Sequence, residues 1–246
     1  MTILLAYNLT SDFAASTVAT GVTGGVATNN LLSSFLRGTN GFASDPVCSA
    51  GPASGATSAV TAISTDSYFY VAITPASGKK ISLTTLTFNA TRGGAATPRG
   101  YDVRSSVDDY ASTLGTANLA TQRETWTAVS IDVSAAGFQD VTTSITFRIY
   151  FFAPSTVNVI DWDDIVINGT VADAGTVEQE GFRFRSDDGS ESGASWLAAQ
   201  DTDIIQPKTT NTRLRMLLNG TLDRGSEQYR LEFRVAGSSD EWEIVE

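Results

Sequence analysis

The sequence contains no histidine, and Cys48 is the single cysteine among its 246 residues. A chain without histidine cannot build a Ser-His-Asp or Cys-His catalytic set, and it has no histidine to bind a metal. One cysteine excludes internal disulfides, zinc-finger clusters and iron–sulfur sites. Cys48 lies in a loop-like stretch of small residues, where we expect a buried or inert thiol. Because so few routes to catalysis are left, we predict that the protein is not an enzyme.

Basic residues are scarce as well: 16 Lys and Arg stand against 27 Asp and Glu, which gives a net charge of −11. Neutralising a nucleic-acid backbone requires basic side chains, so we predict no nucleic-acid partner. The segment Met1–Tyr7 has no basic region, and its apolar run is too short for a signal peptide or a membrane span. We therefore expect an opening strand there, no membrane association, and synthesis in a cytoplasm without disulfides.

Small hydroxyl side chains are abundant, with 32 Thr and 26 Ser in the chain. Thr, Val and Ile suit the pleated surface of β-strands. Apolar and polar residues alternate in short stretches that turn signals separate, which predicts an all-β sandwich or barrel. The alternation slips in phase between Leu83 and Leu86, which indicates a bulge. A short helix is expected at 29–37, and strands at 67–74, 81–88, 101–105, 125–133, 144–152 and 157–168.

The composition changes near residue 172, where charged residues become denser. Strands are expected at 177–185, 212–218, 228–235 and 241–245. They predict a small immunoglobulin- or fibronectin-like β-sandwich at 177–246, after a linker at 172–176. Arginines and glutamates alternate along these strands, and we expect cross-strand ion pairs between them. The residues in question are Arg183, Arg185, Arg213, Arg215, Arg230 and Arg234, with Glu178, Glu180, Glu232 and Glu241.

Several motifs carry a resemblance to known domains. They are Tyr68-Phe-Tyr-Val-Ala-Ile-Thr-Pro75, the 83–88 strand, Tyr101-Asp-Val-Arg-Ser-Ser106, Ala111-Ser-Thr-Leu-Gly115, Thr146-Phe-Arg-Ile-Tyr150 and Ile160-Asp-Trp-Asp-Asp-Ile-Val-Ile-Asn-Gly169. The stretch that they span resembles a jelly-roll domain of bacterial surface proteins and phage virion proteins. Such domains are similar in fold to carbohydrate-binding modules. The resemblance implies a jelly-roll β-sandwich over 1–171.

A second resemblance lies in the tail of the chain. Its motifs are Glu178-Gln-Glu-Gly-Phe-Arg-Phe-Arg185, Trp196-Leu-Ala-Ala-Gln-Asp-Thr202, Tyr229-Arg-Leu-Glu-Phe-Arg234 and Trp242. This pattern resembles a small β-module of tailed-phage proteins. Both resemblances rest on strands and turns and include no catalytic signature. The pattern in the tail of the chain implies a phage particle rather than a secreted glycosidase.

Asp161 and Asp163 are the candidate metal ligands. They would share one face of a strand, with Trp162 on the other face. Two carboxylates that close together can bind Ca²⁺, a cation that prefers oxygen ligands, and Asp12 or Asp66 could add further oxygens. The jelly-roll resemblance adds to this reading, because carbohydrate-binding jelly rolls often hold a structural calcium. The alternative is a solvated strand edge whose charges prevent pairing with another sheet.

Aromatic residues are the candidate ligand platform, because ring faces pack against the C–H groups of pyranose sugars. Adjacent aromatic residues in a strand point to opposite faces, so about half of them must belong to the core. Core packing is the default for Phe69, Phe88, Phe147 and Trp162. The candidate platform consists of Tyr68, Phe69, Tyr70, Trp126, Tyr150, Phe151, Phe152 and Trp162.

Two functional classes follow from these observations. The first is a structural protein of a tailed-phage virion, such as a capsid decoration or head-fibre subunit, made in the host bacterial cytoplasm. We expect it to bind other virion proteins of the capsid or tail and to form a homo-oligomer or a multi-copy assembly. The second is a glycan-binding module of a tail fibre or of a secreted bacterial protein. Both can coexist in one protein. We expect no cofactor other than the calcium considered above.

Overall fold

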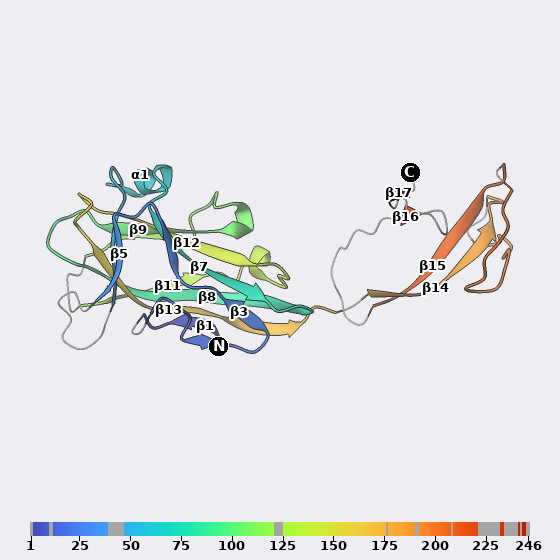
Figure 1. Ribbon diagram of the computed structural model, residues 1–246, viewed down its shortest axis with the longest axis horizontal. Coiled ribbons are helices and arrows are strands. Elements are labelled where there is room, and N and C mark those ends of the chain that lie inside the picture. The colour runs from blue at the N-terminus through green and yellow to red at the C-terminus, as the bar shows by residue number, and fades with distance from the viewer. Residues whose placement is uncertain are drawn as a thin grey trace. The chain divides into compact units, whose positions relative to one another are not determined.

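The computed structural model of the chain contains two compact units, Met1–Ala174 and Gly175–Glu246 (Figure 1). Their boundary lies within the predicted linker at 172–176. The structure describes residues 2–9, 12–38, 47–120, 125–175, 177–189, 192–207, 209–220, 232–233, 241 and 243–244.

Two antiparallel sheets build the first unit and confirm the predicted all-β sandwich (Figure 1). A seven-stranded sheet has the order β11-β8-β13-β1-β2, with β6 also pairing β13 and β5 pairing β6. Its strands are β1 (Thr2–Tyr7), β2 (Thr17–Val18), β5 (Ser34–Gly38), β6 (Val47–Gly51), β8 (Lys79–Arg92), β11 (Thr127–Asp132) and β13 (Ile160–Asp173). A six-stranded sheet has the order β10-β9-β12-β7-β3, with β4 also pairing β7. Its strands are β3 (Val22–Gly24), β4 (Thr28–Asn30), β7 (Tyr68–Pro75), β9 (Gly100–Ser105), β10 (Gly115–Asn118) and β12 (Ile145–Phe152).

The core lies between the two sheets, where Trp162 of β13 is completely buried. Four aromatic rings surround its indole, with centroids 5.1 Å away for Phe69, 5.5 Å for Phe88, 5.8 Å for Phe151 and 6.1 Å for Tyr101. These rings come from both sheets, so the indole joins the two layers. Aromatic pairs at such distances add to the stability that burial alone supplies.

The predicted phase slip in β8 is a β-bulge. Asn168 of β13 pairs with Thr85, and the next residue, Gly169, pairs with Leu83. Thr84 is therefore the extra residue, and the strand changes the face it presents at that point. The apolar residues on both sides of the slip are buried, as predicted: Ile81, Leu83, Leu86 and Phe88.

The helix expected at 29–37 is absent, because this stretch forms β4 and β5, which pair with β7 and β6. A six-residue helix, α1 (Ala59–Ser64), occurs elsewhere. Ser58 and Thr61 form a capping box at its start, in which Thr61 takes the place of the usual Glu or Gln. Short 3-10 turns lie at Ser106–Asp108 and Ala136–Phe138. In the described part of the chain, no helix is long and apolar enough to cross a membrane.

The described residues of the second unit contain two small antiparallel sheets. The strands β14 (Val177–Ser186) and β15 (Thr212–Gly220) form one of them and match the predicted positions. The strands β16 (Glu232–Phe233) and β17 (Glu243–Ile244) form the other, and most of the predicted strands at 228–235 and 241–245 lies outside the described residues. The segment after β14 turns back along it, with the Leu197 amide donating to the Phe184 carbonyl at 3.0 Å.

The arginines of β14 and β15 are arranged differently from the prediction. The register places Arg183 opposite Arg215 and Arg185 opposite Arg213, so cations rather than ion pairs face each other. Arg213 forms an ion pair with Asp187 at 2.7 Å. Alternation in the sequence predicts which residues of a strand share a face, but it does not predict which residues of β14 and β15 lie opposite each other. Arg230, Arg234 and the side chain of Glu232 lie outside the described residues.

Candidate functional site

The outer face of the six-stranded sheet carries two rows of polar and aromatic side chains. Residues that pair directly across neighbouring strands point to the same face. The register therefore defines one row of Thr116, Asp102, Tyr150 and Tyr68, and a second row of Arg104, Arg148 and Tyr70. Helix α1 packs on this face over Tyr68, Tyr150 and Phe152. The second row is left at the edge of the helix, half-buried.

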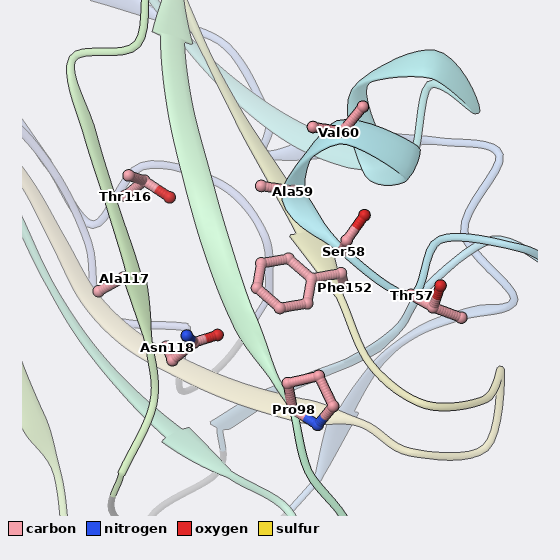
Figure 2. A pocket seen from close by; sticks show the side chains of 9 residues that line it. All are labelled: Thr57, Ser58, Ala59, Val60, Pro98, Thr116, Ala117, Asn118 and Phe152. Atoms are coloured by element: carbon pink, nitrogen blue, oxygen red, sulfur yellow. The ribbon is translucent and has the colours of Figure 1, made fainter.

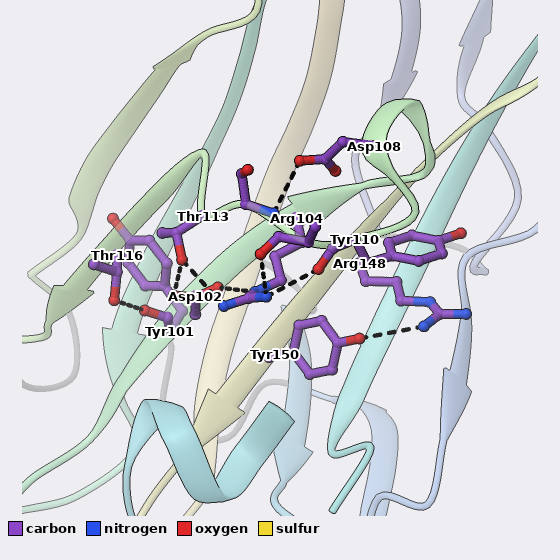
Figure 3. A network of polar contacts seen from close by, with 11 residues as sticks. Tyr101, Asp102, Arg104, Asp108, Tyr110, Thr113, Thr116, Arg148 and Tyr150 are labelled. Atoms are coloured by element: carbon purple, nitrogen blue, oxygen red, sulfur yellow. Dashed lines mark hydrogen bonds and ion pairs between the residues drawn. The ribbon is translucent and has the colours of Figure 1, made fainter. Parts of the chain in front are cut away.

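Arg104 organises the loop that follows β9 (Figure 3). Its guanidinium donates to the carbonyls of Tyr110 at 2.9 Å and Ala111 at 2.8 Å. It also forms an ion pair with Asp102 at 2.9 Å. Thr113 completes the network by donating to Asp102 at 2.8 Å. Since the Asp102 side chain is only 5% exposed, this carboxylate is committed to holding the loop.

The loop contains two consecutive residues in the left-handed region, Asp109 at φ 55° and Tyr110 at φ 60°. This conformation is uncommon for a bulky side chain, and it persists only where the surroundings enforce it. Here Arg104 holds the carbonyls that follow. The consequence is that the Tyr110 ring lies over the guanidinium of Arg148, with the Cζ atom 3.6 Å from the ring centroid.

Arg148 is at the centre of this arrangement, which we call the tyrosine–arginine surface and define as Tyr68, Tyr70, Tyr110, Arg148 and Tyr150. The Arg148 Cζ atom lies 4.6 Å from the centroid of the Tyr68 ring. Its Nη1 donates to the Tyr150 hydroxyl at 3.2 Å. Burial raises the pKa of Tyr68, although the nearby charge of Arg148 opposes this shift. These contacts hold a planar cation among aromatic rings.

A pocket of about 550 Å³ opens on the same sheet face, between α1 and β10 (Figure 2). Figure 2 shows the Phe152 ring between the helix and the strand, with hydroxyl and amide groups around it. The side chains that line the pocket carry no formal charge, so it can offer hydrogen bonds and an apolar ring to a neutral ligand. The lining consists of Thr57, Ser58, Ala59, Val60, Pro98, Thr116, Ala117, Asn118 and Phe152.

The predicted aromatic platform divides into three groups. Phe69, Phe151 and Trp162 point into the core, and Phe88 and Phe147 are buried there as expected. Tyr68, Tyr150 and Phe152 lie under α1 and are at most 8% exposed. Tyr70 on the sheet face and Trp126 next to β11 remain half-exposed.

Sequence reasoning missed Tyr110. It lies in a turn rather than a strand, so alternation gives no information on its direction. The run Asp108-Asp109-Tyr110 offers one signal, since Asp tolerates the left-handed region that such turns use. Tyr110 lies in the loop after β9 and Arg148 lies in β12, so their contact joins two segments that are distant in the sequence.

Asp161 and Asp163 both lie on β13, and their surroundings differ from the predicted solvated edge. Asp161 is completely buried and accepts a hydrogen bond from the Ser49 hydroxyl on β6. Asp163 is half-buried, and one of its oxygens accepts the backbone amide of Asp164 at 2.8 Å. Burial, followed by the charges of both aspartates, raises the pKa of Cys48. Cys48 is buried as expected, although it lies in β6 rather than in a loop.

The calcium interpretation stays a prediction. The described residues contain no cluster of three or more acidic, cysteine or histidine side chains that could hold a metal ion. Asp12 accepts the backbone amide of Ala14 at 2.8 Å, which gives it a local role in a turn. A calcium at Asp161 and Asp163 would therefore need backbone or water oxygens for the rest of its shell.

A second aromatic–arginine contact lies in the second unit. Arg183 and Arg185 both lie over the Trp196 ring, with Cζ atoms 4.2 Å and 4.6 Å from its centroid. The Arg183 Nε donates to the Ala198 carbonyl at 2.9 Å. A pocket of about 310 Å³ lies beside these residues and includes Met216 and Leu217 of β15. The arginines hold the returning segment on β14.

Comparisons with known proteins show what the fold is similar to. No family model and no curated protein sequence matches the chain. Among solved structures, a putative sugar-binding protein from Bacteroides thetaiotaomicron is 13% identical with a TM-score of 0.42, and the match covers 69% of this chain and 100% of that one. The K3 adhesin domain of Lys-gingipain from Porphyromonas gingivalis is 17% identical with a TM-score of 0.38, covering 68% and 99%.

A family 11 carbohydrate-binding module from Clostridium thermocellum, solved with a mixed-linked tetrasaccharide, is 11% identical with a TM-score of 0.33. That match covers 62% of this chain and 91% of the module. These neighbours are bacterial carbohydrate-binding and adhesin β-sandwich domains. At such identities and scores the similarity carries no information on ligand or partner, so function has to be argued from the residues.

Proposed function

We propose that the protein is a non-enzymatic binding protein whose first unit binds a glycan on the outer face of the six-stranded sheet. The observation that carries this proposal is the combination of half-exposed tyrosine rings and an uncharged pocket on one sheet face. Thr116 of the pocket lies in the same cross-strand row as Tyr150 and Tyr68. A ligand on this face can therefore meet ring surfaces and hydroxyl groups together.

The chemistry of the face suits sugar rings. The faces of Tyr70 and Tyr110 can pack against pyranose C–H groups, which removes apolar surface from water. The Thr57 hydroxyl and the Asn118 amide can exchange hydrogen bonds with sugar hydroxyls, and the Thr116 hydroxyl, which donates to the Tyr101 carbonyl at 2.7 Å, can accept one. Asp102, the carboxylate of the first row, is held by Arg104 and Thr113, so we propose binding rather than hydrolysis of the glycan.

Binding of the full chain to a glycan array tests this proposal. We expect a group of related glycans to bind, and we expect Tyr110→Ala and Tyr70→Ala each to weaken binding about tenfold, because each removes a stacking face. Thr170→Ala, an exposed change on the seven-stranded sheet, is the matched control and should bind normally. An array without any bound glycan would overturn the proposal, and so would unchanged binding by both tyrosine variants.

A second candidate function is structural: a subunit of a tailed-phage virion, such as a capsid decoration or head fibre, that docks on a neighbouring virion protein. The observation that favours it is an exposed apolar face on the β14–β15 sheet. Leu214, Met216 and Leu218 alternate along β15 on this face and are 37%, 42% and 47% exposed. Exposed apolar side chains grouped on one face are typical of an interaction surface.

Cryo-electron microscopy of purified particles that carry the protein tests the structural candidate. Many copies on the capsid lattice, with β15 against a neighbouring subunit, would support a decoration role. Copies at the tail tip would favour receptor binding through the glycan surface. If the particles contain no copies, the virion assignment is wrong, and the glycan-binding proposal is unaffected.

A further inference from the structure

Two arginines lie side by side on the outer face of the six-stranded sheet, and their surroundings differ. Arg104 and Arg148 pair directly across β9 and β12. Arg104 has a carboxylate partner, Asp102, and its other donors hold carbonyls and Thr113. The N–H groups of the Arg104 guanidinium are therefore engaged by partners within the protein.

Arg148 has donors to spare. A guanidinium carries five N–H groups. Within the described part of the chain, the Arg148 guanidinium makes one hydrogen bond, to the Tyr150 hydroxyl, and no carboxylate lies within ion-pair distance. Its remaining contacts are with the rings of Tyr68 and Tyr110. Stacked rings cover the face of a guanidinium and leave the donors at its rim in the plane.

This arrangement carries a cost that the fold does not require. Like charges directly opposite each other on neighbouring strands destabilise a sheet, and partial burial adds to the penalty. Aromatic rings recover part of it through cation–π attraction. The chain has a net charge of −11, which means that acidic side chains outnumber the basic ones with which they could form ion pairs. A cation held by rings and lacking an acidic partner is suited to an acidic ligand.

We propose that Arg148 makes this surface selective for glycans with a carboxylate, that is, uronic-acid or sialic-acid sugars. This inference rests on the proposed glycan-binding function. The carboxylate would accept two parallel hydrogen bonds from the planar guanidinium, a geometry that arginine offers and lysine does not. The ring of the same sugar would lie against Tyr110 or Tyr70. Arg104 and its loop position Tyr110 and take no part in binding the ligand.

The test is calorimetric titration of the full-length protein with matched acidic and neutral sugars. The probes are trigalacturonic acid with its methyl ester, and sialyllactose with lactose. We expect at least one acidic probe to bind about tenfold more tightly than its neutral counterpart, as charge-assisted hydrogen bonds predict. Arg148→Gln should remove that preference. Lys80→Gln, which removes one positive charge from the opposite sheet, should retain it.

Arg148→Lys covers the case in which Arg148→Gln does not fold, as judged by its melting temperature. It keeps the charge and lacks the planar donor pair, so it should lose most of the preference. Equal binding of acidic and neutral probes would overturn the inference, as would an acid preference that both Arg148 variants retain. In either case binding of neutral glycans would leave the proposed function standing, whereas no binding of any glycan would overturn both.

Discussion

In β12 of the first unit, Ile145, Phe147 and Ile149 alternate with polar residues and are at most 1% exposed. In β15 of the second unit, Leu214, Met216 and Leu218 also occupy every second position, although Leu217 stands between the last two, and these three side chains are 37–47% exposed. The difference lies in what covers them. The inner face of β12 packs against the seven-stranded sheet, whereas among the described residues β15 pairs with β14 alone.

Alternation therefore determines which side chains share a face, and a second layer determines whether that face is buried. Two-stranded sheets are marginal by themselves in water, and stability requires further packing. A similar spacing of apolar residues thus contributes to the core in one unit and to an exposed face in the other. Four substitutions test this contrast, beginning with the largest expected effect.

Replacing the central core residue should have the largest effect. Trp162→Ala removes a fully buried indole that contacts aromatic rings from both sheets. We expect the free energy of unfolding of the first unit to fall by about 3–5 kcal/mol, because a large cavity remains. Urea unfolding followed by circular dichroism measures this loss. A loss below about 1 kcal/mol would contradict a close-packed core between the sheets.

Removing a partner of the buried carboxylate should have the next largest effect. Ser49→Ala deletes the hydroxyl that donates to Asp161. We expect the free energy of unfolding to fall by about 1–3 kcal/mol, since a buried acceptor loses its donor. The same urea measurement applies, with the exposed change Ser130→Ala on β11 as a control near zero. Equal values for the two serine variants would show that the Ser49 bond adds no stability.

A smaller effect is expected in the second unit. Trp196→Ala removes the ring that Arg183 and Arg185 contact. Cation–π contacts at exposed sites are worth about 0.5–1 kcal/mol each. We expect faster hydrogen exchange at the Leu197 amide, which bonds to Phe184, by roughly fivefold. The Ile149 amide in the first unit should exchange as in the unchanged protein. Unaltered exchange at Leu197 would mean that the ring does not hold this segment.

The smallest effect is expected on the exposed apolar face. Met216→Ser changes a side chain that is 42% exposed, so the free energy of unfolding should change by less than about 0.5 kcal/mol. The same change should weaken attachment if the face docks on a neighbouring virion protein. Differential scanning calorimetry measures the first quantity, and copy number on particles measures the second. A loss of stability near that of Trp162→Ala would show that this face belongs to a core.

Local pattern was sufficient to predict much of the fold. The strand at 67–74 and the bulge beside Leu83 follow from alternation and from its slip, because each depends on neighbouring residues alone. Helix α1 escaped prediction because six residues are too few to show helical periodicity, and Thr61 replaces the usual capping acid. The stretch 29–37 pairs with distant strands, and that pairing determines its conformation.

The candidate site was less predictable, because long-range contacts form it. The buried Asp161 accepts a hydrogen bond from Ser49, which lies 112 positions earlier in the chain. Arg148 meets Tyr110 only because Arg104 holds an unusual turn in place. The aromatic residues named from the sequence included Tyr70, and alternation correctly separated it from Phe69. No short sequence motif indicates that an exposed aromatic ring lies next to an arginine, or that this arginine has no acidic partner among the described residues.

One feature of the larger sheet bears on how the chain is made. Strand β13 pairs with β1, β6 and β8, and Thr2 is joined to Gly169. During synthesis, β1 leaves the ribosome long before β13 exists. Contacts between residues so far apart in sequence slow folding, since a long loop must close first. The sandwich can therefore be completed only after β13 has emerged. In a nascent chain that stops before Ile160, the strands β1, β6 and β8 lack the strand with which all three pair.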